Sequence, residues 1–169
     1  MKNRALQDYY PDDWSYCYGC GRLNDQGLHI KSYWVKETEE SICHFKPQSH
    51  HMAIPGFVYG GLIASLIDCH ATGSAVAAGY QAEERKMGTN PPLRYVTASI
   101  HVDYLKPTPI DTELELRGKA KEVKGRKVIV SVTLFANQEI CAQGEVVIVQ
   151  IPESMMTSLK NKLLLLSFH

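Results

Sequence analysis

The sequence predicts an α+β domain in which an antiparallel sheet wraps around one long apolar helix. Residues 59–78 contain no proline and are mostly small or apolar, which favours a single helix buried on nearly every side. Six other stretches have the composition of β-strands, and the predicted order is β-β-α-β-β-β-β. One sheet covers only one side of such a helix, so we expect a second subunit to bury the remainder.

Strand positions follow from alternating apolar residues between turn signals. The six strands are expected at residues 28–36, 41–45, 93–105, 111–121, 127–135 and 139–151. In the third of these, the alternation places Val96 and Ile100 on one face of the strand. Thr97 and His101 are expected on the opposite face, which is the polar one.

The chain is expected to divide into three parts, namely a lead segment at 1–27, the sheet-and-helix domain at 28–151 and a tail at 152–169. A short terminal helix is expected from Met155 to Phe168. Its run of leucines would cover an edge of the core or form an oligomer contact.

Composition excludes some classes of function. Lysine and arginine total 18 and aspartate and glutamate also total 18, and this zero net charge argues against a nucleic-acid partner. The N-terminus does not resemble a secretory signal, and we expect no membrane-spanning run. Five cysteines, an odd number, indicate free thiols in a reducing cytoplasm.

Asp68 is the one charged residue within the predicted helix. Helical spacing places it on a stripe of small residues, which comprises Gly61, Ala64, Asp68, Ala71 and Ala75. A ligand or another backbone can approach such a narrow face. A buried carboxylate without partners is costly and has a raised pKa, so Asp68 is a candidate catalytic group. The alternative is an aspartate bonded to a nearby amide or hydroxyl.

Gly60 and Gly61 stand at the start of this helix. The first amides of a helix lack intrahelical partners, and glycine leaves them unshielded, so they are candidates for holding a developing oxyanion. Asp68 lies about two turns further along, roughly 11 Å from Gly61 by helix rise. The alternative is that the glycine pair only permits close packing.

Two further groups invite a metal interpretation. Cys17 and Cys20 form a Cys-x-x-Cys pair, but no second pair completes a four-ligand zinc site, and a redox role lacks its usual βαβ setting. His29 or a residue of a second subunit could complete a site, whereas a small-residue turn is the favoured interpretation. His50 and His51 lie together in a loop, where histidines bind metal, transfer protons or simply face solvent.

Three stretches in order carry a resemblance to a known family. The most specific is His-Met-Ala-Ile-Pro-Gly-Phe-Val-Tyr-Gly-Gly at residues 51–61, followed by Asp68. The stretch 96–107 and the Cys17–Cys20 segment are similar to two further signatures. The chain resembles the PaaI-like (phenylacetate-type) hotdog-fold acyl-CoA thioesterases over roughly residues 17–151. The resemblance implies a hotdog fold, a homodimer or a dimer of dimers, and hydrolysis of acyl-CoA to acid and CoA without a cofactor.

The resemblance also implies roles for individual residues. Asp68 matches the catalytic base or nucleophile, and the Gly60 amide matches the group that polarises the thioester carbonyl. His51 matches a positioning residue, and Thr97 matches a hydroxyl supplied across the dimer interface. Tyr59 stands where the family usually has histidine before the glycine pair, and Ala53 stands where many relatives have glycine.

Substrate contacts are expected from Tyr59, Gly61 and Arg126. Arg126 lies in a basic turn with Lys124 and Lys127, which suits the phosphates of CoA or merely a solvated hairpin tip. Tyr59 leaves open a non-catalytic, regulatory acyl-CoA-binding protein. A hotdog enoyl-CoA hydratase is a weaker alternative. It would place an acid beside His70, although neighbouring side chains on a helix point in different directions.

Overall fold

The computed structural model describes residues 4–156 of the 169. The long helix α1 spans Gly60–Ala82. The strands are β1 (Ser32–Val35), β2 (Glu40–Phe45), β3 (Tyr95–Tyr104), β4 (Leu114–Lys124), β5 (Lys127–Ala136) and β6 (Glu139–Gln150). Three short 3-10 turns, η1 (Leu6–Tyr9), η2 (Asp12–Trp14) and η3 (Ser49–His51), lie before α1. The predicted order of strands and helix is confirmed.

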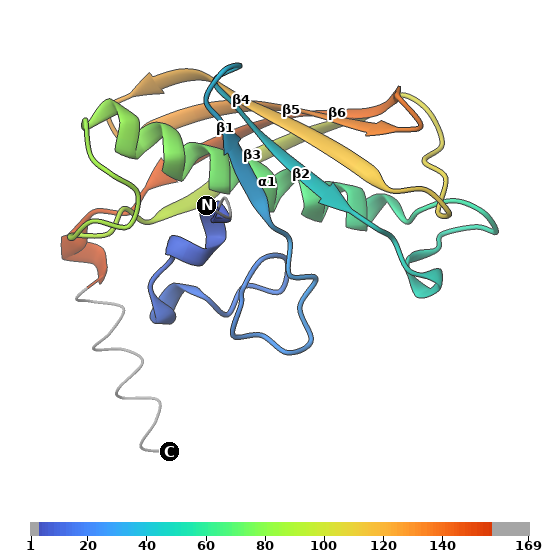
Figure 1. Cartoon of the computed structure of the whole chain (residues 1–169), viewed down its shortest axis with the longest axis horizontal. Helices are drawn as coiled ribbons and strands as arrows, with labels where there is room; N and C mark the ends of the chain where they lie inside the picture. The colour runs from blue at the N-terminus through green and yellow to red at the C-terminus, as the bar shows by residue number, and fades with distance from the viewer. Residues whose placement is uncertain (1–3, 157–169) are drawn as a thin grey trace.

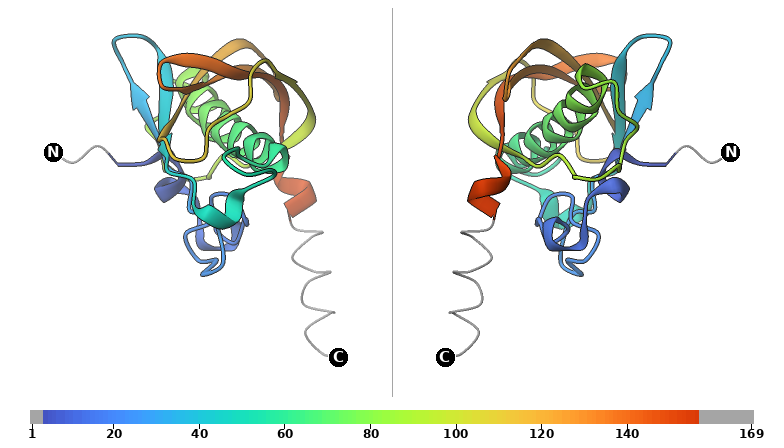
Figure 2. Two further views of the ribbon diagram at one scale, coloured as in Figure 1. Left: turned by 90° about the vertical axis from the view of Figure 1, so that its right-hand side faces the viewer. Right: turned by 90° about the vertical axis from the view of Figure 1, so that its left-hand side faces the viewer.

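All six strands form one antiparallel sheet in the order β1-β2-β4-β5-β6-β3. The sheet curls around α1, which lies along its inner side (Figure 1). Seen end-on, the helix sits within the curve of the sheet, and the lead segment lies on the side of the helix away from the sheet (Figure 2). The helix is apolar on several faces because the sheet covers one side and the lead segment covers part of another.

The core lies between α1 and the inner face of the sheet. Leu66 and Ile67 of the helix are fully buried together with Leu116, Val130 and Ile148 of the strands. Burial of each such side chain contributes roughly 1.5–3 kcal/mol relative to exposure. This packing fixes the rotation of α1, and therefore decides which helical side chains face the sheet and which face away from it.

A polar network crosses this core. His70 is fully buried, and its Nδ1 lies 2.8 Å from the Ser32 hydroxyl while its Nε2 lies 3.2 Å from the Ser41 hydroxyl. The Ser74 hydroxyl donates to the His70 carbonyl at 2.8 Å. Gly118 of β4 faces this network, where a Cβ would lie 2.7 Å from the Ser74 hydroxyl. The network is satisfied, so it does not carry the cost of unpaired buried groups.

A bulge in β3 overturns part of the predicted alternation. The pairing with β6 shifts between Thr97 and Ser99, so the strand gains one residue and its faces exchange at that point. Thr97 therefore faces α1, whereas Val96 is 40% exposed. The prediction that grouped Val96 with Ile100 on one face, and Thr97 with His101 on the other, polar face, was wrong. Alternation along a strand gives no sign of a bulge, because the bulge is defined by the neighbouring strand.

Other element boundaries also differ from the prediction. Strand β4 runs from Leu114 to Lys124 rather than over residues 111–121, and β3 begins at Tyr95 rather than at residue 93. The first strand was expected from residue 28, but Leu28 and Ile30 instead donate backbone hydrogen bonds to Tyr18 and Gly19 of the lead segment, at 2.8 and 3.0 Å. Strand β1 accordingly begins at Ser32. Residues 153–156 are helical, and the rest of the predicted terminal helix lies outside the described residues.

Helix α1 is longer than the predicted helix. With 23 residues, it is long and apolar enough to cross a membrane, so the expectation that no such run exists was wrong. However, 72% of its most apolar window is buried inside the molecule. The core helix of a domain wrapped by a sheet has the same length and composition, so this feature is weak support for a membrane span.

Candidate functional site

Asp68 lies in the middle of α1 and points toward β3. The Thr97 hydroxyl donates a short hydrogen bond to Oδ1 of Asp68, and the Thr72 hydroxyl lies 3.5 Å from that of Thr97. Burial raises the pKa of the Asp68 carboxyl, the Thr97 hydrogen bond lowers it, and the nearby Cys17 raises it. Asp68 and Thr97 thus meet within one chain, whereas the resemblance implied that Thr97 comes from the second subunit.

The Asp68 side chain opens into a cavity of about 390 Å³. Aromatic and sulfur-containing residues dominate its lining, which comprises Tyr10, Asp13, Trp14, Tyr16, Cys17, Cys20, Asp68, Cys69, Thr72, Tyr95, Val96 and Thr97. The Tyr10 hydroxyl is buried and has no hydrogen-bond partner among the described residues. The cavity thus combines a half-buried acid with an apolar wall and a polar group that a ligand can satisfy.

The lead segment supplies much of this wall, and sequence reasoning missed that contribution. Tyr10, Trp14 and Tyr16 come from residues that were expected only to precede the domain. The one available signal was the density of aromatic residues between Tyr9 and Tyr18, because exposed lead segments rarely carry so many large side chains.

The start of α1 forms a second group of predicted site residues. The amides of Leu62 and Ile63 donate to the Tyr59 carbonyl, so the Gly60 and Gly61 amides precede the first helical hydrogen bond. A Cβ on Gly61 would lie 2.3 Å from the Tyr59 ring, so this glycine allows the ring to fold against the helix. The packing interpretation therefore holds for Gly61.

His51 lies beside this helix start, in a second pocket. The backbone amide of Gln48 donates to Nδ1 of His51 at 3.0 Å, which leaves the ring proton of the neutral form on Nε2. Burial, and then the neighbouring His50, lower the pKa of His51. The pocket measures about 340 Å³ and is lined by Tyr18, Leu28, His50, His51, Tyr59, Gly61, Leu62 and Ser65.

Most of the predicted site residues thus fall into two groups within one chain. Asp68 and Thr97 line one pocket, and His51, Tyr59 and Gly61 line the other. The lead segment lies between them, since Cys17 lines the first pocket and Tyr18 lines the second. Gly60 and Arg126 line neither pocket. The Gly60 carbonyl accepts a hydrogen bond from the Tyr104 hydroxyl at 2.9 Å, and Arg126 sits at the β4–β5 turn, where its carbonyl accepts one from Gln150.

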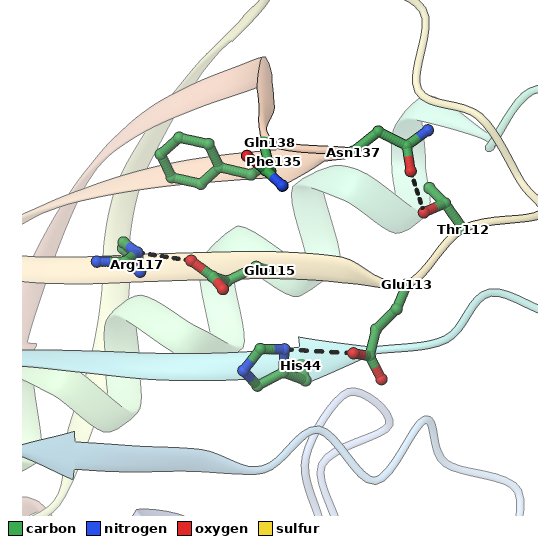
Figure 3. Close-up of a pocket in the computed structure, with 8 residues that line it drawn as sticks. All are labelled: His44, Thr112, Glu113, Glu115, Arg117, Phe135, Asn137 and Gln138. Atoms are coloured by element: carbon green, nitrogen blue, oxygen red, sulfur yellow. Dashed lines mark hydrogen bonds and ion pairs between the residues drawn. The ribbon is translucent and has the colours of Figure 1, made fainter.

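A larger hollow of about 500 Å³ lies on strands β2, β4 and β5 (Figure 3). Most of its polar side chains already bind one another. Glu115 accepts from Arg117 at 2.6 Å, Thr112 donates to Asn137 at 2.7 Å, and His44 lies 3.5 Å from Glu113. None of the predicted site residues lines it, so it is a weaker candidate despite its size.

The Cys17–Cys20 pair has an unexpected neighbour. Cys69, adjacent to Asp68 on α1, brings its sulfur within 4.8 Å of both other sulfurs. His29 does not join them, because its Nε2 lies 2.6 Å from the Asn24 carbonyl at the surface. The sequence shows three thiols, but only the folded chain shows that they meet.

Comparisons with known proteins agree with this architecture. The family model of the thioesterase superfamily matches residues 55–142. A crystal structure of a thioesterase superfamily protein from Shewanella loihica is 47% identical, covers 85% of this chain and all of its own, and has a TM-score of 0.63. The PaaI protein of the E. coli phenylacetic acid degradation operon is 12% identical over 67% of this chain and 73% of its own, with a TM-score of 0.56, so it supports the fold alone.

Curated relatives match a shorter part of the chain. The acyl-coenzyme A thioesterase THEM4 of Rattus norvegicus is 28% identical over 113 residues, which are 67% of this chain and 43% of the relative. The chain therefore spans less than half the length of that relative. The wrapped helix and the solved neighbours confirm the predicted hotdog fold. Because the family model matches more than half of the chain, this protein belongs to the thioesterase superfamily.

Proposed function

We propose that this protein hydrolyses acyl-CoA thioesters to the free acid and CoA. The observation that carries the proposal is Asp68, a half-buried carboxylate of raised pKa that is held by Thr97 and opens into an apolar cavity. A relative named as an acyl-coenzyme A thioesterase supports the substrate class. The aromatic wall suits an acyl group, since ligand pockets combine apolar lining with few polar groups.

Asp68 acts on the thioester in one of two ways. Thr97 occupies Oδ1, so Oδ2 is the oxygen available for the reaction. As a general base, it takes a proton from water while the water oxygen bonds to the carbonyl carbon. The tetrahedral intermediate then breaks its C–S bond, and the CoA thiolate receives the proton. As a nucleophile, the carboxylate bonds to that carbon, the C–S bond breaks, and the CoA thiolate leaves and takes a proton from solvent. Water then cleaves the resulting anhydride to the free acid and the regenerated Asp68 carboxylate.

The Gly60 amide is the proposed donor to the oxyanion, and one such donor typically contributes ~3 kcal/mol. In one chain Gly60 lies roughly 12 Å of helix rise from Asp68, too far to share one carbonyl. We therefore propose that a homodimer forms the site, with Asp68 and Thr97 from one subunit and Gly60, Tyr59 and His51 from the other. The neutral His51 would present its Nε2 proton to the substrate.

The edge of the sheet supports this dimer. Strand β3 is the last strand of the order, and it exposes the apolar residues Val96, Ile100 and Tyr104. An unpaired edge with exposed apolar side chains is a site for pairing with another chain. Association of dimers, a cytoplasmic location and a contact of Arg126 with CoA phosphates stay predictions.

The decisive variant is Asp68→Asn, which keeps the shape of the side chain and removes the base. We expect kcat/KM on acyl-CoA substrates to fall by about 10²–10⁴-fold, with the melting temperature little changed. Thiol release from a panel of acyl-CoA esters measures this. Glu115→Gln is the matched control, because it makes the same change in the larger hollow of Figure 3 and should leave turnover intact.

Full turnover by Asp68→Asn would remove Asp68 from the chemistry. Tyr59, which stands where the family has histidine, favours the second candidate, a protein that binds acyl-CoA without hydrolysing it. Calorimetric binding by the wild type with no thiol release would select that function. The hydratase alternative loses its support, because His70 is fully buried among serine hydroxyls and does not line the Asp68 cavity.

A further inference from the structure

Three cysteines converge beside Asp68, and the proposed hydrolysis uses none of them. Cys17 and Cys20 come from the lead segment and Cys69 from α1, and their three sulfurs all lie within 4.8 Å of one another. The Cys17 and Cys69 sulfurs are 3.8 Å apart. The other two cysteines, Cys43 and Cys141, are buried in the sheet and outside this cluster.

The turn around Cys17 holds two of the three sulfurs. The Cys17 and Cys20 sulfurs lie within 4.8 Å of each other across this turn. The Gly21 amide closes the turn by donating to the Cys17 carbonyl at 2.8 Å. The thiolate is the form of cysteine that binds metal.

Gly19 makes room for the third sulfur. A Cβ at this position would lie 2.2 Å from the Cys69 sulfur, so any other residue would push this sulfur away from the turn. The amide of Ile30 donates to the Gly19 carbonyl at 3.0 Å and holds the turn in place. The absence of a side chain at Gly19 and the hydrogen bond from Ile30 to Gly19 therefore both support the approach of Cys69 to the Cys-x-x-Cys turn.

From this arrangement we infer that Cys17, Cys20 and Cys69 bind a zinc ion that fastens the lead segment to α1. Sulfurs at the corners of a tetrahedron with Zn–S bonds of about 2.3 Å lie roughly 3.8 Å apart, as the Cys17 and Cys69 sulfurs do. The divalent ion would offset the repulsion between three crowded thiolates. The fourth coordination position of the zinc ion would face the cavity that Asp68 lines, where a water molecule can occupy it.

Metal content tests this inference. The full chain, purified under reducing conditions and supplied with Zn²⁺, should bind one zinc per chain by elemental analysis. Replacement by Co²⁺ should give a sulfur-to-cobalt charge-transfer band and the spectrum of a tetrahedral site. Cys17→Ser should weaken zinc binding by more than roughly 100-fold, because loss of an outer hydrogen-bonding partner alone typically costs about 10–100-fold. Cys141→Ser is the matched control and should bind like the wild type.

The inference has clear ways to fail. It is wrong if the reduced wild type takes up no zinc, or if Cys17→Ser binds zinc as tightly as the wild type. It is also wrong if thiol titration finds a disulfide among the three that reduction followed by Zn²⁺ does not convert to a metal site. Cys17 is the most exposed of the three, so its variant is the one best able to fold. Asp68→Asn should keep its zinc, which separates this test from that of hydrolysis.

Discussion

At the scale of single residues, the candidate site depends on one carboxylate and its immediate partner. The burial of Asp68 raises its pKa, and the hydrogen bond from the Thr97 hydroxyl offsets part of this rise. The alternative of an aspartate bonded to a neighbouring hydroxyl thus describes the geometry correctly. It does not exclude function, because within residues 4–156 only Oδ1 of Asp68 has a hydrogen-bond donor and the side chain also lines a cavity.

His70 gives a prediction at the same scale. Burial lowers the pKa of His70 to about 4, while the unfolded chain titrates near 6.5. Below pH 6.5 the unfolded state binds the proton first, so stability should fall as pH decreases from about 6.5 to 4. The loss approaches about 1.4 kcal/mol per pH unit and about 3 kcal/mol in all. It should be absent above pH 7.

Urea unfolding at a series of pH values measures this loss. His70→Gln keeps polar atoms in the network but does not titrate, so its stability should vary less over the same range. If wild type and His70→Gln show the same pH dependence between pH 6.5 and 4, another group is responsible.

At the scale of elements, the contact between α1 and β4 leaves no spare room. A Cβ on Gly118 would lie 2.7 Å from the Ser74 hydroxyl and 2.8 Å from Nε2 of His70. Both groups are fixed by the buried network, so neither can move away without breaking a hydrogen bond. The glycine in β4 is therefore a packing requirement of the helix.

We expect Gly118→Ala to lower the free energy of unfolding by about 1–3 kcal/mol, as overpacked cores do. Denaturant unfolding measures it, and Lys119→Ala, the exposed neighbour on the same strand, should stay within about 0.5 kcal/mol of the wild type. A Gly118→Ala protein as stable as the wild type would show that the helix can shift away from β4.

At the scale of the whole molecule, the proposed site needs two chains. Gly60→Pro removes the amide donor, and proline is tolerated at the first position of a helix. Tyr59 before it already has an extended backbone, with φ of −63° and ψ of 129°, which suits the residue before a proline. Gly60→Pro and Asp68→Asn should each lack activity alone.

Mixing these two inactive variants under conditions that exchange subunits should restore about a quarter of wild-type turnover. Random pairing makes half of the dimers mixed, and each mixed dimer has one intact site of two. Thiol release measures the recovery, and analytical ultracentrifugation confirms the exchange. If the mixture stays inactive although the subunits exchange, each site lies within one chain.

The sequence by itself determined the order of the elements, the long helix and the position of Asp68 within it. These features follow from short-range periodicity, which neighbours along the chain set. The bulge that turns Thr97 toward Asp68, the aromatic wall from the lead segment and the meeting of Cys69 with the Cys17–Cys20 pair were decided only by the tertiary structure. Each depends on contacts between residues far apart in the chain, and local sequence patterns do not reveal such contacts.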